Sequence, residues 1–522
     1  MTQQKSDGRT VPNARRKPRR TREVDTRAGG TSSTVDERAW QLGLRFGTAD
    51  VPAAQAVGVD DRADARRRAP ARHAMPKPKR TKGMATQATM EEVVSRLREA
   101  FANVAANKGA PGPDRQTIEE VSRHLDEVLT RLARTLNDGS YRTGDIRRVW
   151  IPKSGGGERG LGIPNVVDRV VQEAVRMVIE PVYEPTFHAS SHGFRPNRSC
   201  HTAIAEARGY LEDGHDWVVD LDLEKFFDRV HHQRLMARLA QRVHDVRLLR
   251  LVGQMLKAKV VMPDGVRVST EEGVPQGGPL SPLLSNIVLD ELDTELARRG
   301  HRFVRYADDC NIYVRSERAG ERVMASVKGF IERRMRLKVN VSKSAVARPE
   351  ERHFLGFRLR REPMEGSVDV LLSKRSKDRI GETIRRATPR AYGGKLATCI
   401  AALNAVLNGW IAFFGICTRV ETTLKNLDAH IRRRLRAIVV KQWKRRRTIA
   451  RNCVRRGVKP KTAWRNVYGA RRGPWALSHT PAVDRALDVA YFAQSGLVSL
   501  HARWIERQRA IAAPTQLTLT LA

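Results

Sequence analysis

The sequence predicts an α+β fold that is followed by an all-helical part, and two observations carry this prediction. Between about residues 145 and 360, short strand-like runs alternate with amphipathic helices, a mixture typical of α+β proteins. After about residue 370 the strand-like runs end, and long helical patterns with strongly basic faces take their place. With 522 residues, the chain is long enough for roughly two to four domains.

The N-terminal part lacks these patterns. Residues 1–85 are rich in Arg, Ala, Pro, Thr and Gly, and they contain the basic clusters "ARRKPRRTR" and "KPKRTK". We expect a basic, disordered arm here, because such a composition cannot bury enough apolar surface to fold. The first helical spacing of apolar residues follows from Met90 to Phe101, and "GAPGP" then breaks that helix.

Residues 86–365 are predicted to form the mixed domain. Its strand candidates are β-branched, aromatic or apolar runs: "RRVWIPK", "WVVDLDL", "FVRYADDCNIYV" and "FLGFRLR". Its helix candidates repeat apolar residues at helical spacing: "RVVQEAVRMVIEPVY", "RLMARLAQRV" and "RVMASVKGFIERRM". Residues 366–450 are predicted to form an α-helical domain with "KLATCIAALNAVLNGWIAFFG" and "LDAHIRRRLRAIVVKQWKRRR", and residues 451–522 a basic C-terminal region.

The charge of the chain indicates a polyanionic partner. Ninety-six Lys and Arg against 57 Asp and Glu give a formal net charge of +39. Nucleic acid is the favoured partner, since docking Lys and Arg releases counterions from its phosphates. An anionic membrane surface competes with it, but we find no apolar run of about 18 residues that could span a bilayer. The N-terminus also lacks the apolar core of a secretory signal.

The cysteines indicate neither a zinc site nor a disulfide framework. Cys200, Cys310, Cys399, Cys417 and Cys453 are scattered along the chain, with no Cys-x-x-Cys pair. We interpret each of them as a small buried hydrophobe. These observations fit a soluble protein of a reducing compartment, so we expect a cytoplasmic location and no membrane partner.

Two pairs of aspartates interrupt the strand-like runs. Asp308 and Asp309 are adjacent in "RFVRYADDCNIYVRS", and neighbouring carboxylates repel each other by about 1 kcal/mol in water. This pair therefore lies on a solvated turn, which Asp tolerates, or is held by a cation. Asp220 and Asp222 in "WVVDLDLEKFFDRV" are two residues apart, so on a strand they share one face. If the two segments pair, their carboxylates meet and can bind two Mg²⁺ ions.

These segments also resemble a known family. "YADD" at 306–309 and "DLEKFFD" at 222–228 are similar to the palm motifs of group II intron-encoded reverse transcriptase/maturases. Other blocks occur in the family's order: "NKGAPGPD", "IPKSGGGERGLGIP", "SSHGFRPNRSCHTAI", "GVPQGGPLSPLLSNIVLDELD", "LKVNVSKS", "FLGF" and "LNAVLNGWIAFFG". The resemblance covers about residues 88 to 450. It implies a right-hand polymerase, with fingers and palm around a small antiparallel sheet, followed by an α-helical thumb/maturase domain.

The resemblance assigns a role to individual aspartates. It implies that Asp222, Asp308 and Asp309 are the catalytic carboxylates and that they hold two Mg²⁺ ions. Asp220 is the ambiguous neighbour, and Asp222 is preferred because Phe227, five residues later, then takes the position of the family's aromatic residue under the sugar. A bulky ring there would clash with a 2′-hydroxyl and so select deoxynucleotides.

The same resemblance implies a binding site for the deoxynucleoside triphosphate. The loop "SGGGE" would fold over the triphosphate, and Lys343 would donate a proton to the leaving pyrophosphate. The residues of this site would be Lys153, Arg159, Phe227, Gln276, Gly277 and Lys343. Without the resemblance, the loop favours an ordinary solvated hairpin, and Phe226 and Phe227 could both be core residues.

The helices after residue 370 carry the densest charge of the ordered chain. "RRRLRAIVVKQWKRRR" is either a solvated basic helix or a surface that grips nucleic acid, and both can hold at once. Its candidate RNA- or DNA-binding residues are Arg432, Arg433, Arg434, Lys441, Lys444 and Arg445. After about residue 450 no His/Cys nuclease pattern occurs, so the resemblance is to members without the HNH-type endonuclease. There "GPWALS" is similar to a DNA-contacting tail of some bacterial members.

The resemblance thus implies an RNA-directed DNA polymerase that binds its group II intron RNA and assists splicing and mobility by target-primed reverse transcription. Its partners would be the intron RNA, an RNA template with a DNA primer, target DNA and deoxynucleoside triphosphates. Two alternatives stay open. One is a domesticated bacterial reverse transcriptase of a defence or diversity-generating system, and the other is a splicing-only RNA-binding maturase.

Overall fold

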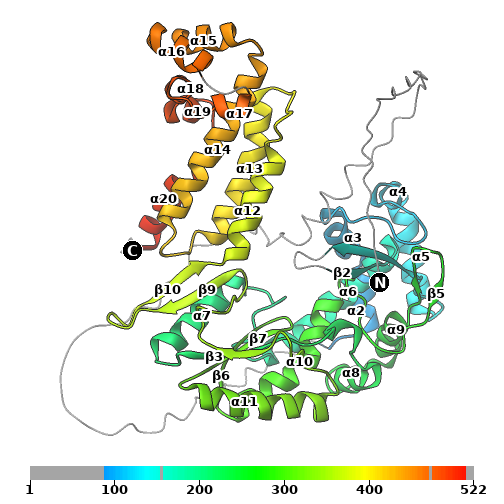
Figure 1. The fold of residues 1–522 in the computed structure, drawn as a ribbon. Helices are drawn as coiled ribbons and strands as arrows, with labels where there is room; N and C mark the ends of the chain where they lie inside the picture. Colours follow the sequence, from blue (N-terminus) through cyan, green and yellow to red (C-terminus); the bar gives the residue numbers. More distant parts are fainter. Residues whose placement is uncertain (1–86, 153–156, 470–472, 513–522) are drawn as a thin grey trace, which may run out of the picture. The chain divides into compact units, whose positions relative to one another are not determined.

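The computed structural model describes residues 87–152, 157–469 and 473–512 (Figure 1). The basic arm expected at residues 1–85 lies outside them. The helices that open the described chain are α2 Met90–Ser95, α3 Leu97–Ala106, α4 Ile118–Arg123, α5 Leu125–Asn137 and, after the first hairpin, α6 Val166–Tyr183. The helix predicted from Met90 to Phe101 is confirmed, although Arg96 divides it into α2 and α3.

A small four-stranded sheet follows the N-terminal helices. Its strands are β1 Ile146–Pro152, β2 Glu158–Ile163, β4 Val260–Val261 and β5 Arg267–Val268. They are arranged in the order β2-β1-β4-β5. β1 and β2 form an antiparallel hairpin, whereas β4 runs parallel to β1. The strand predicted at "RRVWIPK" is thus confirmed as β1.

The second sheet carries both aspartate segments. Its strands are β3 Trp217–Leu221, β6 Arg302–Tyr306, β7 Asp309–Val314 and β8 Ala345–Ala347. They are arranged in the order β6-β7-β3-β8, with antiparallel neighbours. The strands predicted at "WVVDLDL" and "FVRYADDCNIYV" are confirmed, the second as the hairpin of β6 and β7. The prediction of a small antiparallel sheet holds for this region.

The two faces of the second sheet pack against different cores. The covering helices are α7 Cys200–Glu212, α10 Ser281–Arg298 and α11 Glu317–Phe330. Val219 and Ile312 join the first core, which includes α10 and α11, whereas Val218 and Tyr313 join the second core, which includes α7 and extends into the C-terminal helices. Because side chains alternate along a strand, Asp222 belongs to the same face as Val218. The alternation predicted for this strand is therefore observed.

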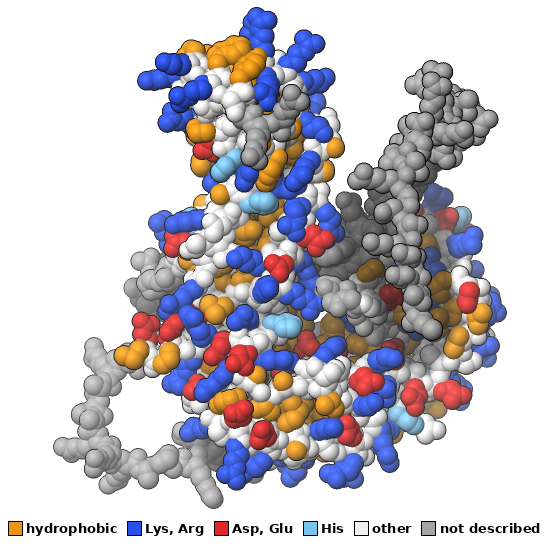
Figure 2. Space-filling view, viewed as in Figure 1, with side chains coloured by type: hydrophobic (Ala, Val, Ile, Leu, Met, Phe, Trp, Pro, Cys, Tyr) orange, Lys and Arg blue, Asp and Glu red, His pale blue; other side chains and the backbone are white. Residues whose placement is uncertain are grey.

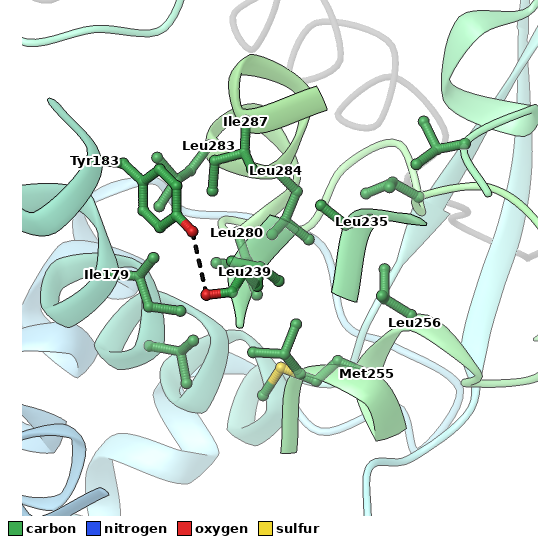
Figure 3. Packing of buried hydrophobic residues seen from close by; sticks show 14 of the residues in the cluster. Ile179, Tyr183, Leu235, Leu239, Met255, Leu256, Leu280, Leu283, Leu284 and Ile287 are labelled. Atoms are coloured by element: carbon green, nitrogen blue, oxygen red, sulfur yellow. Dashed lines mark hydrogen bonds between the residues drawn. The ribbon is translucent and has the colours of Figure 1, made fainter. Parts of the chain in front are cut away.

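The first core holds α10 firmly in place. Figure 3 shows part of it, where side chains of α6 and α10 pack against those of α8 His232–Leu239 and α9 Val246–Leu256. The hydroxyl of Tyr183 donates a hydrogen bond to the carbonyl of Leu239 at 3.2 Å. Leu239 and Leu284 are almost completely buried, and burying such a side chain contributes about 1.5–3 kcal/mol. Residues that α10 presents to the second sheet are therefore positioned by this core.

The C-terminal part begins with a two-stranded ribbon and is helical thereafter. The ribbon and the long helices are β9 Phe357–Arg361, β10 Val368–Leu372, α12 Lys374–Ala387, α13 Leu396–Phe414 and α14 Glu421–Gln442. The shorter helices are α15 Arg446–Arg455, α16 Pro460–Gly469, α17 Pro474–Leu477, α18 Pro481–Ala486, α19 Val489–Gln494 and α20 Leu500–Ala512. The predicted strand at "FLGFRLR" and the helical region after residue 370 are confirmed.

One helix, α13, has the length and composition of a membrane-spanning helix. It has 19 residues and a mean hydropathy of 1.7, and 28% of its apolar window is buried. The prediction that the chain holds no such apolar run is therefore wrong. The reason is its alanine content: Leu403 and Leu407 face the second core, while Ala401 and Ala405 face outward. The exposed side also carries Thr398 and Asn408, whereas the buried residues of the helix are all apolar.

Candidate active site

Asp308 and Asp309 lie at the tip of the hairpin formed by β6 and β7. Leu221, the last residue of β3, pairs with Cys310 of β7. Asp222 is the next residue, so the antiparallel register brings it level with Asp309. Carboxylates from two segments that are distant in sequence therefore meet at one end of the second sheet.

These carboxylates are close enough to perturb one another. Desolvation, followed by the charges of Asp308, Asp220 and Asp222, raises the pKa of Asp309 to about 7. Desolvation also raises the pKa of Asp308, an effect that Asp222 strengthens and Arg159 opposes. The cluster thus concentrates negative charge that a bound cation would relieve.

Lys343 supplies one positive charge to this cluster. Its Nζ lies 3.6 Å from Oδ2 of Asp222, and its side chain is exposed. The loop that carries Lys343 is tied to the end of β3, because the backbone N–H of Asp222 donates to Oγ of Ser344 at 3.0 Å. The N–H of Asn340 in turn donates to the carbonyl of Asp222 at 2.8 Å. The structure therefore places Lys343 beside the predicted catalytic carboxylates.

Asp220 is held differently from Asp222. Nε of Arg352 donates to Oδ2 of Asp220 at 2.8 Å, and Nη2 of the same arginine donates to the carbonyl of Lys343. Desolvation raises the pKa of Asp220, and Arg352 opposes that rise. Because an arginine already pairs with Asp220, its carboxylate is less available to a metal ion than that of Asp222. This favours the choice of Asp222 made from the sequence.

The donor set fits hard divalent cations whose coordination is completed by substrate oxygens. Within the ranges that the structure describes, no group of three His, Cys, Asp or Glu side chains forms a ready-made metal site. Mg²⁺ commonly takes one or two carboxylates, with phosphate and water oxygens supplying the other positions. Asp222, Asp308 and Asp309 offer oxygen donors only, crowded enough for a cation to be favourable. They therefore suit ions that bind together with the substrate.

A cavity of about 320 Å³ lies between the first sheet and the loop that precedes α10. Its walls include Trp150 of β1, Phe227 in the short helix η2 Phe226–Asp228, and Gln276 of the loop. Nε of Arg159 donates to Oε1 of Gln276 at 2.7 Å. The structure thus places two of the predicted nucleotide-binding residues, Phe227 and Gln276, in the wall of one cavity, with Arg159 bonded to one of them.

Gly277 allows a close approach between this loop and β2. Its φ is 124°, and a Cβ at this position would lie 2.4 Å from the carbonyl oxygen of Gly162. The N–H of Gly162 also donates to the carbonyl of Gln276 at 2.6 Å. The close approach predicted at Gly277 is therefore made to the backbone of β2. Lys153, the remaining predicted residue of this site, lies outside the described residues.

The two phenylalanines of η2 have different surroundings. Phe226 is 2% and Phe227 8% exposed, and their rings meet edge to face with centroids 5.2 Å apart. Both belong to the first core, but of the two it is Phe227 that also lines the cavity. Phe227 is therefore the one placed to contact a ligand in the cavity.

Comparison with known proteins matches two family models to this chain. Residues 151–359 match "Reverse transcriptase (RNA-dependent DNA polymerase)" and residues 377–456 match "Group II intron, maturase-specific domain". Protein YkfC of Escherichia coli (strain K12) is 33% identical over 304 residues, which are 50% of this chain and 80% of YkfC. The chain belongs to the group II intron-encoded reverse transcriptase/maturase family. The predicted family, α+β fold class and reverse transcriptase and maturase assignments are thereby confirmed.

A second relative is named for the same kind of intron. The group II intron-encoded protein LtrA of Lactococcus lactis subsp. cremoris is 32% identical over 233 residues, 42% of this chain. The chain spans 80% of YkfC but only 38% of LtrA. Among solved structures, a partial Cas6-RT-Cas1–Cas2 complex has a TM-score of 0.31 and 24% identity, covering 47% of this chain and 42% of that chain. That likeness is too slight to support an argument about this chain.

The reverse transcriptase domain contains a buried arginine that sequence reasoning missed. Arg305, two residues before the hairpin turn, is 0% exposed. Its guanidinium donates to the carbonyl of Ala307 at 2.9 Å, to Oδ1 of Asn286 at 3.0 Å and to Oγ of Ser191 at 2.6 Å. The sequence signal was present, because an arginine inside an otherwise apolar strand needs partners if that strand is buried.

Gly193 packs directly against the backbone of the turn between β6 and β7. A Cβ at Gly193 would lie 2.3 Å from the backbone nitrogen of Ala307, so only glycine fits against the turn. The carbonyl of Gly193 accepts a hydrogen bond from Nδ2 of Asn286 at 2.8 Å. The adjacent His192 is fixed in turn, since its Nε2 lies 2.7 Å from Oε2 of Glu206. The loop at 190–194 is therefore a rigid support for the turn that carries Asp308.

The basic residues predicted on the maturase helix α14 and just after it fall into two groups. Arg434 is buried, and its guanidinium donates to Oγ1 and to the carbonyl of Thr388, both at 2.6 Å. The structure therefore does not support the predicted nucleic-acid contact for Arg434, because burial within the helical core withdraws its guanidinium from solvent. The other predicted residues are partly or fully exposed: Arg432, Arg433, Lys441, Lys444 and Arg445.

Proposed function

We propose that this chain is an RNA-directed DNA polymerase that also binds a group II intron RNA and assists its splicing and mobility. The observation that carries the proposal is the meeting of Asp222 with Asp308 and Asp309 at one end of the second sheet. The two domain matches support it, since one is to reverse transcriptases and the other to group II intron maturases.

Asp222, Asp308 and Asp309 would hold two Mg²⁺ ions in this proposal. Reverse transcriptases use divalent metal ions, and when bound such ions stabilise charge on the attacking and leaving oxygens of a phosphoryl displacement. The raised pKa values of Asp308 and Asp309 support this assignment, because they arise from desolvation and, after it, from repulsion between neighbouring carboxylates, and bound cations would offset both. The carboxylates would thus fix the reacting phosphate in line with the primer end.

The triphosphate would enter the cavity beside Phe227 and Gln276. The primer 3′-oxygen forms a bond to the α-phosphorus of the deoxynucleotide, and the bond to pyrophosphate breaks. Arg159, held by Gln276, would offer its guanidinium to the triphosphate, and Gly277 would keep the loop backbone close. Lys343 would give a proton to the leaving pyrophosphate. Lys153 is proposed as a further phosphate contact on sequence grounds.

Phe227 would select the sugar. Its ring forms part of the cavity wall and is only 8% exposed. A 2′-hydroxyl directed at this wall would meet the ring, whereas a deoxyribose would not. The proposed substrates are therefore deoxynucleoside triphosphates.

The helical part would bind the intron RNA and the template with its primer. Arg432, Arg433, Lys441, Lys444 and Arg445 keep exposure, so they remain the proposed phosphate contacts. Residues 451–522 are proposed to contact target DNA. The match to reverse transcriptases and the net charge of +39 both support an association with nucleic acid. We propose the bacterial cytoplasm as its compartment.

The domain matches favour this proposal over both alternatives from the sequence. A domesticated reverse transcriptase has no need of the maturase domain that matches at residues 377–456. A splicing-only maturase has no need of a complete carboxylate set, yet Asp222, Asp308 and Asp309 are all present. A reverse transcriptase that also assists the splicing of a group II intron therefore explains both the maturase match and the complete set of carboxylates.

Primer extension on an RNA template with Mg²⁺ tests the proposal. Asp308→Ala is expected to abolish extension while leaving the affinity for intron RNA nearly unchanged, because Asp308 sits at the hairpin tip rather than on a basic surface. Asp213→Ala, which removes an exposed carboxylate after α7, is the matched control and should extend normally. Extension by the Asp308 variant at the normal rate would show that the site is wrongly assigned.

A further inference from the structure

Two large aromatic side chains lie exposed on α16, remote in sequence from the polymerase motifs. Trp464 is 37% and Tyr468 50% exposed. They stand one helical turn apart, and their rings are stacked with centroids 5.5 Å apart and an interplanar angle of 20°. The pair therefore presents a flat aromatic surface to solvent.

This aromatic pair is not what attaches α16 to the protein. Ala463 and Val467 are completely buried and belong to the second core, so they provide the packing face of the helix. Oδ1 of Asn466 accepts a hydrogen bond from the N–H of Ala482 at the start of α18 at 3.2 Å. Exposed aromatic surface costs free energy in water, so a stacked pair outside the packing face calls for a partner.

Exposed aromatic side chains are rare in the described part of the chain. Among the described residues, four Trp, Phe or Tyr side chains are exposed, and two of them are Trp150 and Phe194. Trp150 lines the nucleotide cavity, and Phe194 lies with its ring centroid 6.5 Å from that of Tyr306, beside the catalytic hairpin. The other two are Trp464 and Tyr468. The exposed rings outside α16 thus lie where nucleotides are proposed to bind.

The charge around the pair selects an anionic partner. No Asp or Glu occurs between Ala429 and Val483, whereas Lys and Arg are frequent there. The guanidinium of Arg446 lies 6.0 Å from the ring centroid of Tyr468 and donates to the Tyr468 carbonyl at 3.1 Å. Figure 2 shows hydrophobic side chains gathered over α15 and α16, at the top of the view, with Lys and Arg around them. A partner with negative charge and flat apolar faces fits this surface.

We propose that Trp464 and Tyr468 form a stacking platform for unpaired bases of a nucleic-acid strand, whose phosphates are met by the surrounding Lys and Arg side chains. Aromatic side chains that stack on bases within a basic surface are the physical basis of binding to single strands. The inference rests on the proposed function, because it takes nucleic acid as the partner. Within residues 451–522 it names the side chains that contact the nucleic acid and specifies that they bind unpaired bases rather than duplex.

The proposal is tested on the full chain by fluorescence anisotropy, with a template–primer already bound at the polymerase site. Three labelled probes of equal length are compared: a single strand, an abasic single strand and a duplex, each in RNA and DNA form. Trp464→Ala should weaken binding of the single strand by about 5- to 150-fold, the range expected for the loss of one stacked base. The abasic strand and the duplex should bind as they do to the unaltered chain. The RNA and DNA arms show which strand the platform prefers.

Two further variants separate stacking from packing and from charge. Trp464→Phe keeps an aromatic ring and should retain most of the affinity, whereas Trp464→Leu keeps apolar bulk and should lose it. Arg465→Gln, on the exposed side of the same helix, should flatten the salt dependence for all three probes alike. Equal losses on base-bearing and abasic strands, or full affinity in Trp464→Leu, would overturn the proposal.

A failure of the stacking proposal can be distinguished from a failure of the proposed polymerase function. Primer extension on a short RNA template should proceed normally in Trp464→Ala, because the platform lies outside the carboxylate cluster and its cavity. Extension that survives Asp308→Ala would refute the polymerase site and leave the stacking result standing. Normal polymerase behaviour with no base-dependent loss in Trp464→Ala would refute the platform alone.

Discussion

The guanidinium of Arg305 and the carboxylate of Asp293 form a fully buried, two-pronged ion pair beneath the hairpin that carries Asp308 and Asp309. Nε donates to Oδ1 at 2.7 Å and Nη2 to Oδ2 at 2.6 Å, and both side chains are 0% exposed. Asp293 comes from α10, which the first core holds in place, while Arg305 also donates to the carbonyl of Ala307 in the turn. The pair therefore links the turn that precedes Asp308 to a rigid helix.

Breaking this pair should cost both stability and activity. Arg305→Met leaves the carboxylate of Asp293 buried without its partner, which typically destabilises a protein by about 3–5 kcal/mol. Urea unfolding measures this loss, and primer extension measures the effect on the hairpin. We expect extension to fall even at temperatures where the variant remains folded, because the Ala307 carbonyl loses its donor.

A double variant separates the two effects. Arg305→Met combined with Asp293→Leu removes both charges, so much of the stability should return while extension stays low. Full recovery of extension together with stability would show that the pair only stabilises the fold and does not position the turn.

The second prediction concerns the contact between Gly193 and the turn. In Gly193→Ala the new methyl group would lie 2.3 Å from the backbone nitrogen of Ala307 and 3.0 Å from the carbonyl carbon of Tyr306. The turn must shift, at a cost of about 1–3 kcal/mol, and primer extension should fall sharply. Gly209→Ala in α7, where a Cβ meets nothing within 4 Å, is the matched control. It should leave extension unchanged and stabilise the helix by about 0.5–1 kcal/mol.

These two predictions show where sequence reasoning stops. Asp220, Asp222, Asp308 and Asp309 could be singled out because they interrupt strand-like runs, whereas the choice of Asp222, Asp308 and Asp309 among them came from the family resemblance. For Arg305 the apolar strand around it signalled that it would need partners if buried, but its burial and the identity of those partners could not be predicted, because both depend on how α10 packs under the sheet. The role of Asp293 could not be predicted either, because the sequence of α10 does not determine which of its sides faces the sheet. That orientation is set by the packing of the core.

Arg434 illustrates the same limit on the helical side. The run "RRRLRAIVV" presents three arginines in succession, and helical periodicity alone gives no strong reason to treat one of them differently. The packing of α14 against the end of α12 buries Arg434 and pairs it with Thr388, while Arg432 and Arg433 keep partial exposure. Helices, strands and motifs depend on local sequence and could be predicted. Which of three neighbouring arginines is buried depends on tertiary packing and could not.

The third prediction tests the proposed sugar selection. Phe227→Val should open the cavity wall and raise the incorporation of ribonucleotides relative to deoxynucleotides, which competition assays with both nucleotides measure. Phe226→Leu is the control, because Phe226 is core and does not line the cavity. It should lower stability without changing the sugar preference. An unchanged preference in the Phe227 variant would remove this residue from the specificity site.

The fourth prediction concerns pH and stability. Desolvation, strengthened by the charge of Asp293, raises the pKa of Asp290 on α10 to about 6, although Arg305 and other arginines oppose the rise. An unfolded aspartate titrates near pH 4, so between about pH 4 and 6 the folded state binds more protons than the unfolded state. The contribution of Asp290 to the free energy of unfolding is therefore fully present below pH 4 and is lost as the pH rises through 6.

Asp290→Asn should remove this dependence. Relative to the unaltered chain, the variant should gain stability as the pH rises from 4 to above 6, measured by urea unfolding in that range. Asp213→Asn changes the net charge by the same amount at an exposed position and serves as the control. Parallel stability curves for Asp290→Asn and the unaltered chain would contradict the assignment of this carboxyl.

The last prediction concerns the basic residues at the end of α14 and just after it. Lys441, Lys444 and Arg445 are exposed, so each can neutralise one phosphate of bound RNA. Changing all three to Gln should reduce the slope of log affinity against log salt by up to about 0.9 per lost contact for duplex and about 0.7 for single strands. Arg434→Gln is the contrast, because Arg434 is buried against Thr388. It should lower the free energy of unfolding and leave the salt slope unchanged, and a slope that falls equally in both variants would place Arg434 back among the phosphate contacts.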